Sequence, residues 1–298
     1  MGIADLVPGI SGGTIAFVLG IYEEFIFSLS KISISSLKNI KNKGFKYFWC
    51  EINGGFLLKI FSGIILGISL FTYLIDWLII NYKILLWSFF LGVLLSSMLF
   101  IYKKIKTNKF NLLLYFFFGI LISFSITQIN PYSEVQSISK IYLFLTSLIA
   151  ISAMMLPGVS GAYILIIFGT YSEVILIIKG ILNMLFFQDY TNANTILHKA
   201  FFVASGIVSG ILIFSKIFKW LLTTHYDRTL IFLIGLMMGG LSKIWPWQEN
   251  ENLVLPFNYS GENYFLLSLV FFISGILFIS SIQLLEKKIY DAKKKINN

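Results

Sequence analysis

Two short motifs in the sequence place a Pro-Gly pair one residue before Ser-Gly, at residues 8–12 and 157–161. Proline removes a backbone donor and glycine tolerates either backbone hand, so each motif is expected to break a helix. Both motifs lie in apolar sequence, where the freed backbone groups need a partner. A helix that restarts after such a break presents free N–H groups and the positive end of its dipole. The chemistry that these motifs predict is the binding of a phosphate or a carboxylate.

The candidate phosphate-binding residues are the prolines, glycines and hydroxyl residues of the two motifs: Pro8, Gly9, Ser11, Gly12, Gly13, Thr14, Pro157, Gly158, Ser160 and Gly161. The hydroxyls supply hydrogen bonds, and the glycines let a ligand oxygen approach the backbone. The alternative is that these small residues only allow two hairpins to pack tightly. Because the motif occurs twice, we favour packing together with ligand binding.

Four charged residues are candidates for ion coupling or headgroup contact. Glu24 and Glu173 occupy matched positions after the two breaks, where each either faces water or takes part in proton or cation coupling. Asp5 precedes the first break and has no acidic counterpart, so it is expected to cap the half-helix or to carry a proton. Arg228 lies at a predicted inner membrane edge, where it either anchors a helix or contacts a lipid phosphate.

The composition is that of a polytopic membrane protein, since 57% of the 298 residues are hydrophobic and 12% are charged. A soluble domain carries about twice that charge. One cysteine and two distant histidines exclude a disulfide framework and a metal cluster, and we expect no cofactor. The net charge of +9 fits lysines on cytoplasmic loops, not nucleic-acid binding. We expect no cleavable signal peptide.

Apolar stretches of membrane-spanning length alternate with polar loops. The expected membrane segments are 3–29 and 141–178, each broken by a motif, and 56–80, 84–102, 110–126, 200–222, 229–244 and 264–285. The segment 229–244 is short for a span. Strongly basic segments lie at 31–54, at 103–109 and in the C-terminal tail, and an acidic loop lies at 245–263.

The two halves of the chain repeat one another. Residues 4–26 align without gaps on 153–175, with ten of the 23 positions identical, and matched glycines follow in the later spans. We therefore divide the chain into a first repeat, residues 1–130, and a second repeat, residues 131–298. Glycine pairs at matched positions, Gly63 with Gly67 and Gly206 with Gly210, predict close helix packing.

Placing every basic segment in the cytoplasm and the acidic loop outside fixes the orientation, with a cytoplasmic C-terminus. Each half is then a broken re-entrant helical hairpin plus three transmembrane helices. Since three is odd, the second half lies upside down relative to the first. The predicted fold is an all-α polytopic membrane protein with two inverted-topology repeats, the plan of many secondary transporters.

Residues 2–17 (GIADLVPGISGGTIAF), with residues 20–23 (GIYE) and the second motif, resemble the bacterial polyprenyl-phosphate transporter family. This PopT-type family was formerly a domain of unknown function, and the resemblance covers nearly the whole chain. It implies flipping of undecaprenyl phosphate or a related polyprenyl phosphate across the bacterial plasma membrane, which recycles the carrier lipid for envelope synthesis. The arm before Pro8 is shorter than in the family, so either this arm is short or the true start lies upstream of Met1.

The expected mechanism is alternating access, with the phosphate held between the two breaks and the prenyl tail left in the bilayer. A proton or a sodium ion is a candidate coupling partner. A transporter of a small anionic metabolite would use the same architecture, and a structural membrane protein is a further alternative. A lipid-phosphate hydrolase is less expected, because in the bacitracin-resistance type an Arg follows the motif serine, whereas Gly12 and Gly161 stand here. We therefore expect no catalytic activity.

Overall fold

The computed structural model describes residues 1–6, 11–107, 109–129, 138–186, 188, 190–249 and 252–297. The first half contains α1 (Gly2–Asp5), α2 (Gly12–Val18), α3 (Tyr22–Ser30), α4 (Ile34–Lys43), α5 (Phe45–Glu51), α6 (Gly54–Asn81), α7 (Lys83–Lys104), the 3-10 turn η1 (Lys109–Leu112) and α8 (Leu113–Gln128). The second half contains α9 (Lys140–Met155), α10 (Gly161–Ile167), α11 (Tyr171–Phe186), α12 (Ala193–Thr224), α13 (Tyr226–Gly240), η2 (Leu241–Ile244), the strands β1 (Gln248–Glu249) and β2 (Asn252–Leu253), η3 (Pro256–Asn258) and α14 (Phe265–Asn297).

The helices confirm a multi-pass membrane protein. Among the described residues, five helical segments are long and apolar enough to cross a membrane, namely α6, α7, 110–128, α12 and the part of α14 up to residue 284. The pairs α2–α3 and α10–α11 bend by 117° and 115°, and counting each pair as one span gives up to seven. The predicted short span, residues 229–244, corresponds to α13, which has 15 residues, followed by η2, which has four. The all-α membrane fold and its two broken segments agree with the sequence, whereas the inverted relation of the halves stays a prediction.

The bend in each broken segment follows a glycine in the left-handed region, with φ of 68° at Gly20 and 64° at Gly169. A residue with a Cβ is strained at such a φ, so glycine is required at both bends. In each bend the glycine N–H and the next N–H donate back to the last helical turn, closing the helix end in a Schellman motif. The four bonds, of 2.9–3.1 Å, are Gly20 to Phe17, Ile21 to Ala16, Gly169 to Ile166 and Thr170 to Leu165.

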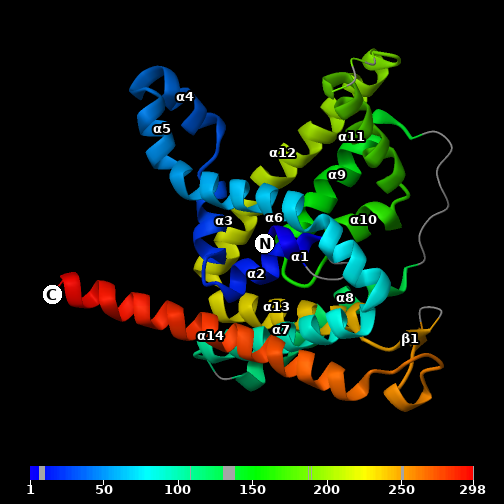
Figure 1. Ribbon diagram of the computed structural model, residues 1–298. Helices are drawn as coiled ribbons and strands as arrows, with labels where there is room; N and C mark the ends of the chain where they lie inside the picture. The colour runs from blue at the N-terminus through cyan, green and yellow to red at the C-terminus, as the bar shows by residue number, and fades with distance from the viewer. Residues whose placement is uncertain are drawn as a thin grey trace.

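Helices α7, α8, α13 and α14 lie together across the lower part of Figure 1, beneath the broken segments. α7 packs on α14 and α8 on α13, and a glycine of each helix lies against a backbone carbonyl of its partner. The contacts join Gly92 to the Phe272 carbonyl, Gly275 to the Phe89 carbonyl, Gly235 to the Phe116 carbonyl and Gly119 to the Phe232 carbonyl. An added Cβ would overlap each carbonyl, so these packing pairs depend on glycine.

The glycine pairs on α6 and α12 only partly behave as predicted. Gly206 and Gly210 lie against α9, and Gly67 lies against the backbone of α1. Gly63 faces open space, so the predicted packing contact at this residue is wrong. The reason is that α1 has four residues and touches α6 on the side of Ile64 and Gly67.

Segments of opposite charge lie at opposite ends of the molecule. The basic helices α4 and α5 and the C-terminus lie toward the left in Figure 1, and the strand β1 of the acidic loop lies toward the right. Helices α4 and α5 lie in the segment 31–54, which the sequence predicted to be basic without predicting helices in it. Ser33 begins α4 with a capping box, its hydroxyl accepting from the N–H of Ser36.

Candidate functional site

The two breaks meet and are joined by hydrogen bonds between side chains of the first and the backbone of the second. The Ser11 hydroxyl donates to the Leu156 carbonyl at 3.0 Å, and the Gly158 N–H donates to Thr14 Oγ1 at 3.1 Å. Ser11 is 1% exposed and Thr14 is fully buried. In this conformation both hydroxyls satisfy backbone groups freed by the other break, and their contact with a phosphate stays a prediction.

The N-terminus of α2 is capped by Asp5, one of the two roles predicted for this residue. Its Oδ1 accepts from the Gly12 N–H at 2.6 Å. Gly12 and Gly13 are buried, and Gly13 lies against the Met155 carbonyl. A protein carboxylate therefore already occupies the position that the sequence predicts for an anion at the first break. Pro8 and Gly9 lie outside the described residues.

The second break is more open than the first. Glycine is required at position 158 for two reasons. Its φ is 84°, and a Cβ there would overlap the backbone of Met237 on α13. Ser160 caps α10, its hydroxyl accepting from the Tyr163 N–H at 3.4 Å, and it is half-buried. Gly161 packs against α9, and Pro157 is buried. The predicted residues of this motif thus combine backbone roles with exposure to a cavity.

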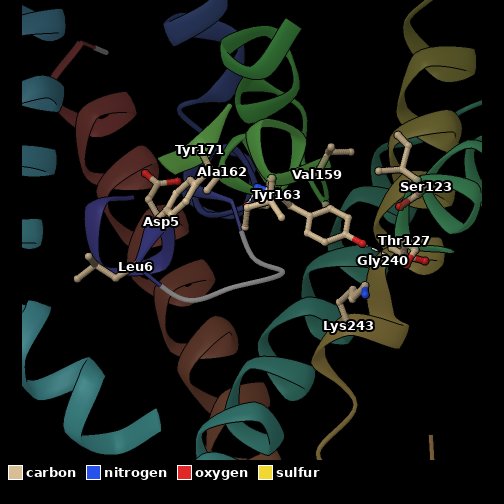
Figure 2. Close-up of a pocket in the computed structure, with 14 residues that line it drawn as sticks. Asp5, Leu6, Ser123, Thr127, Val159, Ala162, Tyr163, Tyr171, Gly240 and Lys243 are labelled. Carbon is tan, nitrogen blue, oxygen red and sulfur yellow. Dashed lines mark hydrogen bonds between the residues drawn. The ribbon is translucent and has the colours of Figure 1, made fainter. Parts of the chain in front are cut away.

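A cavity of about 420 Å³ lies beside the second break (Figure 2). Its walls come from the end of α1, the break at 158–160, α10, the start of α11, α8, and the end of α13 with η2. The polar residues of this lining include Asp5, Ser123, Thr127, Ser160, Tyr163, Tyr171 and Lys243. The rest of the lining is largely aliphatic, so the cavity offers a few polar groups in apolar surroundings, as ligand pockets commonly do.

Lys243 and Tyr163 form the polar end of this cavity. The Lys243 ammonium lies 5.0 Å from the centroid of the Tyr163 ring, and the Tyr163 hydroxyl donates to the carbonyls of Thr127 and Ile129 at 3.3 and 3.4 Å. In Figure 2 the Tyr163 ring points across the cavity toward Thr127, with Lys243 beside it. The Trp87 indole donates to the Lys243 carbonyl at 3.1 Å, which anchors the backbone of η2. In the described part of the chain Lys243 forms no ion pair, so its charge is available to a ligand.

Three other candidates lie away from this cavity. Glu24 accepts from the Asn53 amide at 2.8 Å, which joins α3 to the start of α6. Glu173 pairs with Lys199 at 2.6 Å, which joins α11 to α12. Arg228 lies at the opposite end of α13 from η2. The matched acids therefore tie each broken hairpin to the long helix that follows, and their role in coupling stays a prediction.

The aligned tyrosines show that the two breaks differ in this conformation. Tyr22 is 1% exposed and donates to the Met155 carbonyl at 3.1 Å. Its counterpart Tyr171 is 40% exposed and lines the cavity. The first break is closed by protein groups, and the second borders open space.

Sequence reasoning did not identify Lys243, Tyr163, Thr127 or Tyr171 as cavity residues. One signal was present, because Lys243 falls inside the predicted span 229–244. An ionisable residue within a membrane segment is a functional candidate by default. Nothing in the sequence shows that η2 places the Lys243 side chain beside Tyr163 of α10. No group of metal-binding side chains occurs among the described residues.

Comparison with known proteins gives one consistent result. A family model described as "VCA0040-like: Undecaprenyl phosphate translocase-like" matches residues 1–264. A polyprenyl-phosphate transporter of Vibrio cholerae serotype O1 is 40% identical over 262 residues, covering 88% of this chain and 79% of the relative. A polyprenyl-phosphate transporter of Staphylococcus aureus is 32% identical over 289 residues, covering 93% of this chain and 90% of the relative. No solved structure matches the chain. The chain belongs to the undecaprenyl phosphate translocase-like family.

Proposed function

We propose that this protein translocates undecaprenyl phosphate or a related polyprenyl phosphate across the membrane, and that the cavity beside the second break holds the phosphate. Two relatives are named polyprenyl-phosphate transporters, which supports the substrate class. The observation that carries the assignment of the site is the Lys243 ammonium, which forms no ion pair among the described residues, in a cavity lined by hydroxyl and apolar residues at the meeting of the two breaks.

The cavity suits a phosphate attached to an apolar chain. Lys243 supplies a point charge, and Ser160 and Thr127 supply hydroxyls within the same lining. Apolar walls lower the local dielectric constant, which strengthens the attraction between ammonium and phosphate. A prenyl tail needs no polar partner and remains among lipid-facing side chains. Gly158 and Ser160 are the predicted motif residues that we assign to this site, with Pro157 and Gly161 shaping the break.

Alternating access between two inverted repeats, residues 1–130 and 131–298, is the mechanism we propose. The matched glycine contacts support it, because α7 packs on α14 as α13 packs on α8, through aligned residues. The difference between the breaks supports it too, since one is sealed by Asp5 and Tyr22 while the other borders a cavity. In the opposite state the first break would open, and Ser11 and Thr14 would face the lipid phosphate.

The sidedness follows from charge. We assign the end that carries α4, α5 and the C-terminus to the cytoplasm of a bacterial plasma membrane, and the end that carries β1 to the outer face. The clustering of basic segments at one end supports this orientation. Asp5 is the candidate for coupling to a proton or a sodium ion, because its carboxylate lines the proposed phosphate site.

The test is lipid movement by the purified protein in liposomes. A labelled polyprenyl phosphate is placed in one leaflet, and its appearance in the other is followed by accessibility to a membrane-impermeant reagent. We expect the wild-type protein to accelerate exchange. Lys243→Gln and Ser160→Ala together should slow it about tenfold or more, since charged hydrogen bonds contribute ~1.5–3 kcal/mol each. Lys140→Gln, at an exposed lysine outside the cavity lining, is the control and should exchange normally.

Two further readouts separate the alternatives. Free phosphate released from the lipid would indicate a hydrolase, and uptake of a soluble phosphorylated metabolite without lipid exchange would indicate a small-anion transporter. Exchange that is unchanged in the double variant, with the protein folded, would refute the assignment of this cavity.

A further inference from the structure

A second polar cavity, of about 740 Å³, lies at the other end of α13, where the α7–α8 turn meets the α12–α13 turn. The Asp227 carboxylate ties the two turns together, accepting from the N–H of Lys106 at 3.2 Å and of Thr107 at 2.8 Å. Three basic side chains line the same cavity: Lys106, His225 and Arg228. None of the three forms an ion pair within the described residues, and basic side chains outnumber the one carboxylate, Asp227, in the lining.

Arg228 is held in place without using its hydrogen-bond donors. Its guanidinium carbon lies 5.6 Å from the centroid of the Tyr115 ring, which also lines the cavity. A cation–π contact of this kind does not use the N–H groups of the guanidinium. No hydrogen bond of this side chain occurs in the part of the chain that the structure describes. A planar set of donors in this arrangement fits a phosphate group.

An apolar groove of about 470 Å³ runs between α7, α8 and α13 directly beside this cavity. Ile231 in the groove lies one helical turn from Arg228, and Phe116 follows Tyr115. Leu99 on α7 and Met238 further along α13 extend the groove toward the middle of the molecule. A basic cavity next to an apolar groove matches the two parts of a phosphorylated lipid.

We propose that this cavity and groove form a second binding site for an isoprenoid lipid monophosphate, separate from the cavity at Lys243. The choice of lipid rests on the proposed function. Fifteen residues separate Arg228 from Lys243, which at 1.5 Å per residue is about 22 Å of helix. This length is most of the ~30 Å hydrocarbon thickness. The two sites thus lie toward opposite membrane surfaces, and the second site receives the lipid after it has crossed.

The test is photo-crosslinking of the full chain in detergent micelles with a prenyl monophosphate that carries a diazirine on its tail. We expect adducts on segments 95–102, 113–116 and 231–238. The variant Lys106→Gln/Arg228→Gln should lower the yield on these segments about tenfold, because it removes both charged phosphate contacts. Lys103→Gln, at the end of α7 and outside the cavity lining, is the matched control and should label normally. Adducts beside Tyr163 should persist in every variant, which shows that the protein is folded.

Three results would overturn the second site: equal yields in the double variant, equal labelling by the corresponding prenyl alcohol, or full displacement by inorganic phosphate alone. The last result would assign the cavity to free phosphate instead of a lipid. Labelling in micelles does not require transport. Labelling without lipid exchange in liposomes would therefore contradict only the proposed function, and exchange without labelling would contradict only this site.

Discussion

Replacing Thr14 by Val tests whether the first motif holds the second break in place. Valine keeps the shape of threonine but removes the oxygen that accepts from the Gly158 N–H at 3.1 Å. Thr14 is fully buried and Gly158 is half-buried, so the freed N–H has only limited access to water. A buried donor left without a partner costs about 1–3 kcal/mol, and we expect Thr14→Val to destabilise the protein by about 2 kcal/mol. For a chain of this size the midpoint of thermal unfolding should fall by roughly 3–6 °C.

The assay is intrinsic tryptophan fluorescence during heating in detergent, with Thr72→Val as the control. Thr72 lies on α6, and its hydroxyl donates only to the Ile68 carbonyl of the same helix. The control makes the same chemical change without orphaning a backbone group, so its midpoint should stay close to that of the wild type. Equal midpoints for the two variants would refute the idea that Thr14 stabilises the second break.

Two further predictions concern the packing of α8 on α13 and the turns joined by Asp227. Gly235→Ala should destabilise the protein by about 1–3 kcal/mol, because the added Cβ overlaps the Phe116 carbonyl. Gly63→Ala is the control and should not lower the thermal midpoint, because Gly63 faces open space. An equal fall of the midpoint in both variants would contradict the packing of α13 on α8. Burial acts to raise the pKa of Asp227, but hydrogen bonds from the Thr107 and Lys106 N–H groups outweigh it and leave this pKa below its usual value of about 4. Its small stabilising contribution is therefore complete above pH ~4 and is lost as the pH falls through the lower pKa of the folded state. The protection factor of the amides at 106–107, measured against the intrinsic exchange rate at each pH, should stay constant from pH 7 to ~5 and fall below ~4; a fall already near pH 6 would contradict the assignment.

Much of the fold could be predicted from the sequence because hydrophobic length and charged loops constrain a membrane protein strongly. Each predicted membrane segment coincides with helices, including the short segment at α13 and η2. The helices α4 and α5 could not be predicted in this way, since they lie in a polar, basic stretch. Gly63 shows a second limit, because a glycine motif marks a surface that can pack closely but does not say whether a partner covers it.

The candidate site was only partly predictable. The Pro-Gly-Ser motifs located the breaks, and the capping role of Asp5 followed from its position before a half-helix. The wall opposite the second break could not be predicted, because Lys243 reaches it through η2, and Thr127 lies more than thirty residues before Tyr163. Contacts of that kind depend on how α8, α10 and η2 pack, which local sequence patterns do not encode.

The unequal environments of the two motifs are the main result that sequence alone could not provide. Alignment treats Tyr22 and Tyr171 as equivalent, yet one is sealed inside the protein and the other borders a cavity. In this conformation Asp5 and Tyr22 seal the first break, while the hydroxyls of the first motif are bonded to the backbone of the second. In the alternating-access mechanism that we propose, opening the first break requires Ser11 and Thr14 to release Leu156 and Gly158. These hydrogen bonds stabilise the observed state, so Thr14→Val should lower stability and also shift the balance between the two proposed access states.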